Sequence, residues 1–331
     1  MDCAIKPNVT VILPVYNTNN KYLKAIHSVL NQTYTDFEVI VIDDNSPERV
    51  CVENFGDSRI KLLTRSVSGG GPSLARNDGL RAAVGKYITF LDADDTYEPD
   101  FLNCMIMSMQ NGNDYVTCQF FVKQENKKYV YRDDVLDNEY EINDINTFVT
   151  QNLRFISASV WNAMFRADII ERENIKFVDN EYLFEEDVAF TYQYLSHCKR
   201  VGFISTALYT YEIHNDSICA NYKADNAVDI LRYLRLIEFL GPIFNVEVLS
   251  IFLIKSLDYC YRKSKLHLEQ FFKLISESKE IKMILKCFNG ANGTEVCKYW
   301  RILGFDMSVF SSALVYGHLN EAIDMINKIL K

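Results

Sequence analysis

The residues of this chain best suited to chemistry are three aspartates, Asp92, Asp94 and Asp95, which follow an apolar segment at 87–91. The apolar run is typical of a buried strand, and the carboxylates would then lie at its C-terminal end, where open α/β sheets build ligand sites. Oxygen ligands without a nearby His or Cys suit Mg²⁺ or Mn²⁺ that carries a phosphorylated substrate. A short acidic cluster is also typical of a helix N-cap, so the pattern alone leaves both interpretations open.

The first hundred residues alternate between predicted strands and predicted helices. The spacing of apolar residues indicates strands at 9–13, 37–42 and 60–63 and helices at 22–31 and 74–84. Acidic or glycine residues follow these strands, at the positions where a ligand lies in a nucleotide-binding sheet. We therefore expect an α/β fold with the chemistry-bearing residues after its strands.

The rest of the chain divides into a mixed part and a helical part. Segment 115–122 indicates another strand, segment 124–144 is an acidic, polar insertion, and the spacing from residue 225 onward is helical. Residues 1–221 hold 20 basic and 32 acidic side chains, whereas residues 222–331 hold 15 and 12. This change predicts a first domain at 1–221 and an α-helical region at 222–331.

Composition narrows the class of protein. With 331 residues, of which 48% are hydrophobic, the chain can form one large domain with an annex, or two domains. The net charge of −9 argues against non-specific binding of nucleic acid. Nine cysteines without a C-x-x-C pair favour reduced thiols and a cytoplasmic location. We find no secretory signal pattern, and no apolar run approaches the ~20 residues that span a membrane.

Seven short motifs occur in the order and approximate spacing of family 2 glycosyltransferases of the A-type fold, and residues 8–220 resemble that family. The motifs are Pro14-Val15-Tyr16-Asn17, Asn31-Gln32-Thr33-Tyr34, Val41-Ile42-Asp43-Asp44-Asn45-Ser46, Ala75-Arg76-Asn77-Asp78-Gly79, Leu91-Asp92-Ala93-Asp94-Asp95, Trp161-Asn162 and Glu185-Glu186-Asp187. The resemblance implies a Rossmann-like GT-A fold for nucleotide-diphospho-sugar transfer, with a donor half at about 8–110 and an acceptor half at about 111–221. Residues 222–331 match none of these motifs.

The resemblance implies a donor-nucleotide site at Pro14, Tyr16, Asn17, Asp43, Asp44, Arg76, Asp92 and Ala93. Either Asp43 or Asp44 would accept a hydrogen bond from an N–H of the base, and since uracil offers such a donor, a UDP-sugar is favoured. Arg76, in the helix behind the glycine loop, would hold the base or the diphosphate. The alternatives are strand-end caps for the two aspartates and a solvent-facing position for the arginine.

The resemblance also implies a metal site in the acidic segment. Asp92 would lie near the ribose or the metal, and Asp94 would be the more direct ligand of a divalent cation, Mn²⁺ or Mg²⁺, between the two phosphates. Asp95 would either orient this site or cap the next helix. His214 falls where related sequences often carry a basic residue, so it would contact the metal or the diphosphate; the alternative is a structural histidine.

Asp187 is the candidate general base that the resemblance implies, with Glu186 as the second choice. Inverting sugar transfer requires a carboxylate that accepts the proton of the acceptor hydroxyl. Three adjacent acids cannot all face one site, so at least one of them would cap the helix or face solvent. Glu185, Trp161 and Asn162 are expected on the acceptor side, where the Trp ring would stack on a sugar; the alternative for Trp161 is the core.

Together the motifs predict an inverting, metal-dependent enzyme that moves a hexose, taken as glucose or galactose, from a UDP-sugar to a hydroxyl of a glycan. The expected acceptor is a lipid-diphosphate-linked sugar in the synthesis of a cell-surface polysaccharide such as O-antigen or capsule. The basic, aromatic segment 259–268 would either contact the inner face of the cell membrane as a peripheral surface or form a solvated helix end.

Two other functions fit parts of the sequence. Asp92-Ala93-Asp94-Asp95-Thr96 matches the D-x-D-x-T pattern of haloacid-dehalogenase-type phosphatases, in which Asp92 would be the nucleophile and Asp94 the acid/base. That motif normally follows the first core strand, whereas here it follows the fourth predicted strand, and it leaves segment 185–187 unexplained. The second rival is a catalytically silent protein that binds a nucleotide sugar.

Overall fold

The structure is a computed structural model that describes residues 6–67, 69, 71–131, 136–152, 156, 159–214, 223–266 and 268–285. The chain forms two compact units. The first comprises Met1–Asp144, Gln151–Asn180 and Glu186–Asn215, and the second comprises Ile145–Thr150, Glu181–Glu185 and Asp216–Lys331. The boundary predicted after residue 221 falls in segment 215–222, which lies outside the described residues, so it stays a prediction.

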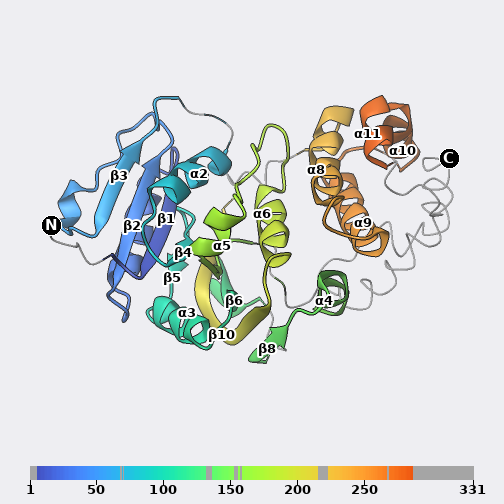
Figure 1. The fold of residues 1–331 in the computed structure, drawn as a ribbon. Helices are drawn as coiled ribbons and strands as arrows, with labels where there is room; N and C mark the ends of the chain where they lie inside the picture. Colours follow the sequence, from blue (N-terminus) through green and yellow to red (C-terminus); the bar gives the residue numbers. More distant parts are fainter. Residues whose placement is uncertain are drawn as a thin grey trace. The chain divides into compact units, whose positions relative to one another are not determined.

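The first unit is built on one mixed β-sheet (Figure 1). In chain order its strands are β1 (Val9–Val15), β2 (Phe37–Asp43), β3 (Ile60–Thr64), β4 (Tyr87–Phe90), β5 (Thr96–Tyr97), β6 (Tyr115–Gln124), β7 (Lys127–Val130), β8 (Asn138–Glu141), β9 (Ala163–Arg166) and β10 (Arg200–Glu212). Hydrogen-bonded neighbours follow the order β3-β2-β1-β4-β9-β6-β10-β5, with β7 beside β6 and β8 beside β10. The predicted strands are confirmed, and the polar insertion contributes β7 and β8 to the sheet.

One edge of this sheet collects the ends of several strands. Val15 of β1 pairs with Asp43 of β2, and Ile12 of β1 pairs with Phe90 of β4, both in parallel, so these three strands end at the same edge. β9 runs antiparallel to β4 and β6, and β10 runs parallel to β6, so β9 begins and β10 ends there as well. Most of the sequence motifs therefore lie along one edge, where open α/β sheets bind ligands.

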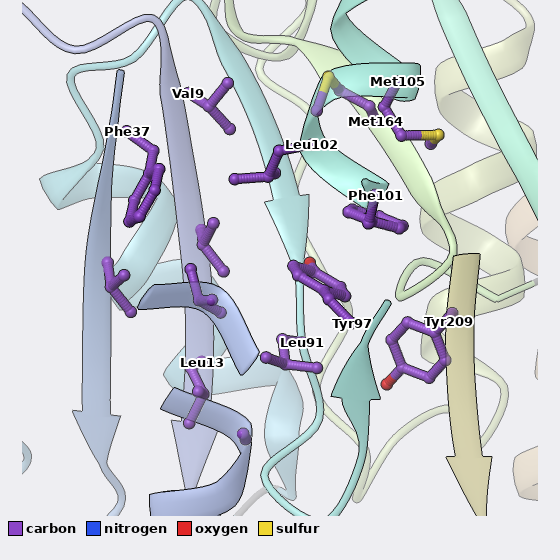
Figure 2. Packing of buried hydrophobic residues seen from close by; sticks show 14 of the residues in the cluster. Val9, Leu13, Phe37, Leu91, Tyr97, Phe101, Leu102, Met105, Met164 and Tyr209 are labelled. Carbon is purple, nitrogen blue, oxygen red and sulfur yellow. The ribbon is translucent and has the colours of Figure 1, made fainter. Parts of the chain in front are cut away.

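Helices α1 (Lys21–Leu30) and α3 (Phe101–Gln110) cover one face of the sheet. Figure 2 shows Val9, Leu13 and Phe37 of β1 and β2 in one apolar cluster with Phe101 and Leu102 of α3. Alternate residues of a strand point to the same face, and the buried residues of α1 recur at helical spacing. Both periodicities direct apolar side chains into this cluster.

Helices α2 (Pro72–Ala82) and α6 (Glu186–Leu195) pack on the opposite face. A Cβ on Gly79 of α2 would lie 2.5 Å from Cγ2 of Ile12, so the helix backbone rests directly on β1. The ring of Phe90 in β4 lies 5.2 Å from Phe177 and 5.9 Å from Phe190 of α6, between centroids. These edge-to-face contacts fix the start of α6 near the end of β4.

Gln32, in the second sequence motif, joins two segments of the first unit by hydrogen bonds. Its side chain is buried, its Nε2 donates to the Glu98 carbonyl at 2.7 Å, and its Oε1 accepts from the Leu102 backbone N–H at 2.8 Å. This amide group thus ties the end of α1 to the segment between β5 and α3. The short helices η1 (Glu53–Phe55) and α5 (Ala167–Arg172) complete the described helices of this unit.

The second unit is helical in its described part. It contains most of α4 (Ile145–Asn152), together with α8 (Ala227–Leu240), α9 (Val246–Lys263), α10 (Leu268–Glu277) and α11 (Lys279–Leu285). The side-chain oxygens of Asn226 and Asn245 cap α8 and α9 by accepting backbone N–H groups at 2.9 and 3.1 Å. α8 packs against α9 and α11. Among the helices of the described ranges, none combines the length and hydropathy of a membrane span.

We predict that Gly79→Ala destabilises the protein, although alanine is the better helix former by about 1 kcal/mol. The added Cβ would lie 2.5 Å from Ile12 and 3.0 Å from Ile42, and such overpacking costs about 1–3 kcal/mol. Urea unfolding followed by circular dichroism measures the change in free energy, with the exposed Arg81→Ala of the same helix as control. An unchanged or higher free energy of unfolding would contradict the close packing of α2.

Candidate functional site

The centre of the candidate site is the guanidinium group of Arg76, which is 4% exposed. Its Nη2 donates to Oδ1 of Asp92 at 2.8 Å, and its Nη1 donates to Oε1 of Glu186 at 2.8 Å. Burial acts to lower the pKa of Arg76, but the charges of Asp92 and Glu186 outweigh burial and raise it. A permanent cation therefore joins the end of β4 to the start of α6. The sequence motifs contain all three residues but give no sign of this link across 110 residues.

Glu186 and Asp187 begin α6 but differ in how they are held. Both oxygens of Glu186 are engaged, since Oε1 accepts from Arg76 and Oε2 accepts from Nδ2 of Asn180 at 2.5 Å. Oδ1 of Asp187 accepts the backbone N–H of Val188 at 2.8 Å, whereas Oδ2 accepts no hydrogen bond from the described residues. Of the two carboxylates, Asp187 therefore keeps an oxygen that can receive a proton.

The environment of this pair favours proton uptake. Burial and the charge of Asp187 raise the pKa of Glu186, while Arg76 acts in the opposite direction. Burial likewise raises the pKa of Asp187, with a further contribution from the charge of Asp92. A carboxylate with a raised pKa is a stronger base at neutral pH, which is the property that a general base needs.

Asp95 is a structural residue at the end of the acidic segment. It is 1% exposed, its Oδ2 accepts from the Tyr209 hydroxyl at 2.7 Å, and its Oδ1 accepts from the Glu212 backbone N–H at 2.8 Å. Burial and the two preceding aspartates raise its pKa well above its ordinary value. It thus clamps the turn after β4 to β10, and helix α3 takes Asp100 as its N-cap residue instead.

Asp92, Asp94 and His214 were predicted to bind a divalent cation. Burial and the charge of Asp92 raise the pKa of Asp94, and His214 partly offsets this. Nε2 of His214 is buried and has no hydrogen-bond partner among the described residues. An orphaned imidazole nitrogen close enough to Asp94 to influence the pKa of that carboxyl fits a metal site completed by substrate phosphates. In the described ranges, no three His, Cys, Asp or Glu side chains are grouped so that they could hold a metal ion.

The residues predicted to bind the donor nucleotide also lie along the carboxyl edge of the sheet. Tyr16 is 53% exposed just after β1, so its ring is accessible, while Pro14 is partly buried. The backbone N–H of Asn17, a residue with φ 48°, donates to Oγ of Ser46 at 3.2 Å. Oδ1 of Asp43 accepts the Ser46 backbone N–H at 2.8 Å, as a strand-end cap does. Ala93, in the turn after β4, is buried.

Asp44 is paired with a basic residue that the motifs do not contain. Arg65, directly after β3, forms an ion pair with Asp44, and its Nε lies 2.9 Å from Oδ2 of Asp78. Burial raises the pKa of Asp44, although the charge of Arg65 opposes this. A hollow of about 480 Å³ adjoins Arg65 and is lined by Leu63, Thr64, Arg65, Ser66, Val67 and Asp78. The sequence held one signal for the partner of Asp44, namely that the basic residue Arg65 comes just after the third predicted strand.

Trp161 belongs to an aromatic stack before β9. Its ring lies 4.4 Å from Tyr209 at an interplanar angle of 29° and 5.7 Å from Tyr211 at 7°, while Phe120 meets it edge-on at 4.8 Å. The indole is only partly buried. Part of the indole therefore packs in the core, as the alternative interpretation expected. Stacking of the exposed part on an acceptor sugar stays a prediction.

Asn162 and Glu185 contact elements of their own units. Asn162 is 1% exposed and its Nδ2 donates to the Cys118 carbonyl at 2.6 Å, which joins β9 to β6. Glu185 belongs to the second unit, where its Oε2 accepts from the Ser256 hydroxyl at 3.2 Å. Both sets of contacts are structural, and an acceptor role for either residue remains a prediction.

Comparison with known proteins identifies the family of the N-terminal half of this chain. The model of glycosyl transferase family 2 matches residues 10–173. The uncharacterized glycosyltransferase EpsJ of Bacillus subtilis is 31% identical over 224 residues, which cover 64% of this chain and 63% of EpsJ. The Escherichia coli UDP-Glc:alpha-D-GlcNAc-diphosphoundecaprenol beta-1,3-glucosyltransferase WfgD is 42% identical over 107 residues, 32% of this chain and 42% of WfgD.

A solved structure extends the likeness over most of the fold. TarS 1–349 of S. aureus, crystallised with UDP-GlcNAc, matches with a TM-score of 0.71 at 18% identity and covers 98% of this chain and 90% of the TarS chain. This likeness confirms the predicted Rossmann-like GT-A fold. The alignments with the first three curated relatives span 63% to 65% of their lengths, which is less than two thirds. Residues 10–173 are therefore a domain of glycosyl transferase family 2.

Proposed function

We propose that this chain transfers a hexose from a UDP-sugar to a hydroxyl group of a glycan, with inversion at the anomeric carbon. One observation carries the proposal: the buried guanidinium of Arg76 bonds to Asp92 on one side and to Glu186, the neighbour of Asp187, on the other. A donor-side aspartate and a candidate base are thereby held next to one another by a single cation. That arrangement suits a displacement in which a base and a leaving group act at the same carbon.

Asp187 is the base in this proposal. Its free carboxylate oxygen removes the proton of the acceptor hydroxyl as the hydroxyl oxygen forms a bond to the anomeric carbon. The bond from that carbon to the diphosphate oxygen breaks on the opposite face, and UDP leaves with the bonding electron pair. Glu186 takes no part as a base, because both of its oxygens already accept hydrogen bonds. Its contact with Arg76 fixes the first turn of α6.

Asp94, Asp92 and His214 would hold a divalent cation, Mn²⁺ or Mg²⁺. When bound, such a cation neutralises the charge that develops on the departing diphosphate. Arg76 orients Asp92 through its hydrogen bond, and the orphaned Nε2 of His214 supplies a free donor or ligand atom. Asp95 holds the whole turn against β10, so these side chains are in place before a substrate arrives.

The choice of donor and acceptor rests on chemistry and on relatives. Asp43 or Asp44 would accept from the N–H of a uracil base, and the exposed ring of Tyr16 would cover it. TarS was crystallised with UDP-GlcNAc and the name of WfgD gives a UDP-Glc donor, which supports a UDP-sugar here. The name of WfgD also gives a diphosphoundecaprenol-linked acceptor, which supports a lipid-diphosphate-linked sugar. Contact of segment 259–268 with a membrane surface is part of this proposal.

The two rival functions receive less support. The phosphatase interpretation rests on the D-x-D-x-T match alone, and both the family match of residues 10–173 and the place of that motif after β4 count against it. A silent nucleotide-sugar-binding protein would keep the donor site but would not need a carboxylate with a free oxygen and a raised pKa. Turnover separates this rival from the transferase.

The direct test combines a panel of UDP-, GDP- and dTDP-sugars with Mn²⁺ or with EDTA, and reads thermal stabilisation and release of the nucleoside diphosphate. We expect one UDP-sugar to stabilise the protein only with metal and to release UDP slowly, because water can replace the acceptor. Asp94→Ala should remove the metal-dependent part of the stabilisation. Metal-independent binding in the unmodified protein, or an unchanged metal response in the variant, would contradict the metal site. Stabilisation without turnover would favour the silent binder.

Asp187→Asn should lower kcat by about 10²–10⁴-fold, the usual contribution of a general base. The amide keeps the shape of the side chain, so the Kd of the UDP-sugar should stay near that of the unmodified protein. Steady-state transfer and calorimetric titration of donor measure the two quantities. Asp168→Asn, an exposed carboxylate of the same unit, is the control. Undiminished turnover of Asp187→Asn would rule out Asp187 as the base.

The rate of transfer should rise with pH through a pKa above the ordinary Asp value of about 3.9. The base works only when ionised, and burial raises the pKa of Asp187, so protonation stops the reaction at a higher pH than for an exposed carboxyl. Glu186→Gln removes a neighbouring negative charge and should move the acid limb to lower pH. Initial rates at saturating donor give the profile. An acid limb below pH ~4, or one that moves upward in Glu186→Gln, would contradict this assignment.

A further inference from the structure

Asn180 lies between the start of α2 and the start of α6. Its Oδ1 accepts hydrogen bonds from the hydroxyl of Ser73 at 2.7 Å and from the backbone N–H of Ser73 at 3.2 Å. Its Nδ2 donates to Oε2 of Glu186 at 2.5 Å. One amide group therefore connects the helix that carries Arg76 with the helix that carries the carboxylate pair.

Gly71 leaves the space that this amide group occupies. Its φ is +59°, and a Cβ at this position would lie 2.6 Å from Oδ1 and 2.8 Å from Cγ of Asn180. Any side chain at position 71 would therefore both strain the backbone and push the amide away from Ser73. The glycine is required here for its conformation and for the close approach of Asn180.

The orientation of Glu186 depends on two donors. Arg76 binds one oxygen and Asn180 binds the other, so the carboxylate cannot rotate without losing a hydrogen bond. Hydrogen bonds to an ionised acceptor are among the stronger ones in proteins. Because Asp187 follows in the first turn of α6, the bonds that hold Glu186 also hold the backbone from which the Asp187 side chain projects.

We propose that Asn180 is a positioning residue, which holds Glu186, and through it Asp187, in the orientation required for proton transfer. The inference rests on the proposed function and goes beyond it, because Asn180 belongs to none of the seven sequence motifs. Its bond to Ser73 makes the same orientation depend on the start of α2. A shift of the start of α2 would therefore also shift Glu186 and the base that follows it.

The main test replaces the donor of the hydrogen bond between Asn180 and Glu186 with an acceptor, and then restores the bond in the opposite direction. Asn180→Asp keeps the oxygen that accepts from Ser73 but sets a carboxylate against Glu186, so kcat should fall at least about tenfold, as for other residues that orient a catalytic group. Combined with Glu186→Gln, the new amide donates to the new carboxylate while its oxygen still accepts from Arg76. The double variant should transfer sugar several-fold faster than Asn180→Asp alone. Donor Kd should change little in both variants, and kcat is expressed per folded protein because both variants also alter the buried charges around Arg76.

A second test leaves the three hydrogen-bonded residues, Ser73, Asn180 and Glu186, unaltered. Gly71→Ala should lower kcat in the same way, because its Cβ displaces Asn180. Gly56→Ala is the control for a positive φ, since Gly56 has φ +60° with nothing within 4 Å of an added Cβ. The two backbones differ in ψ, which is 20° at Gly56 and −157° at Gly71, so this control does not reproduce all of the strain at position 71. Ser73→Ala, which removes one of the two bonds to Oδ1 but spares the bond to Glu186, should have a smaller effect.

The outcomes separate this inference from the proposed function. Loss of kcat in Asn180→Asp and Gly71→Ala, with recovery in the double variant, supports positioning. Turnover of the unmodified protein with unchanged kcat in both variants overturns the inference and leaves the transferase intact. A fall in melting temperature with unaltered kcat of the folded fraction also overturns it, because Asn180 would then only stabilise the fold. An unmodified protein without turnover overturns the proposed function and the inference with it.

Discussion

The buried ion pairs of Arg76 are the interaction on which the rest of the site depends. A guanidinium that is 4% exposed is costly to bury unless its charge is compensated, and Asp92 and Glu186 provide that compensation from two separate elements. Removing one partner of such a network typically costs about 3–5 kcal/mol, because the others remain buried without their counter-charge. The same charges that stabilise the fold therefore set the distance between the donor-side turn and the carboxylate pair.

The β-sheet makes this arrangement possible. Parallel pairing of β1, β2 and β4 brings three strand ends to one edge, and β9 and β10 add their ends from the other half of the sheet. Asp95 joins the two halves through Tyr209 and the backbone of Glu212. Asp95 is engaged by these structural bonds, whereas Asp92 bonds to Arg76. Neighbouring acidic residues thus have different partners, set by the strands and helices around them.

Much of the fold and part of the site could be predicted from the sequence. Apolar runs such as 9–13 and 37–42 indicate strands through local periodicity, and acids after strands indicate a ligand edge. The bond from Arg76 to Glu186 could not be predicted, because a hydrogen bond across 110 residues leaves no local pattern. The same holds for Asn180 between Ser73 and Glu186, whereas the place of Arg65 directly after a parallel strand is a local signal. The buried contacts of Asn162 and Asp95 also depend on strands that pair only in the folded sheet.

The central claim is that a single carboxylate, Asp187, acts as a base and not as a nucleophile on the sugar. The stereochemistry of the product tests this claim most directly. With the α-linked UDP-sugar and acceptor that support turnover, proton NMR of the new anomeric centre reports the configuration. The account predicts a β-linked product, since one displacement inverts the carbon. A uniformly α-linked product would require a different mechanism and would contradict the account.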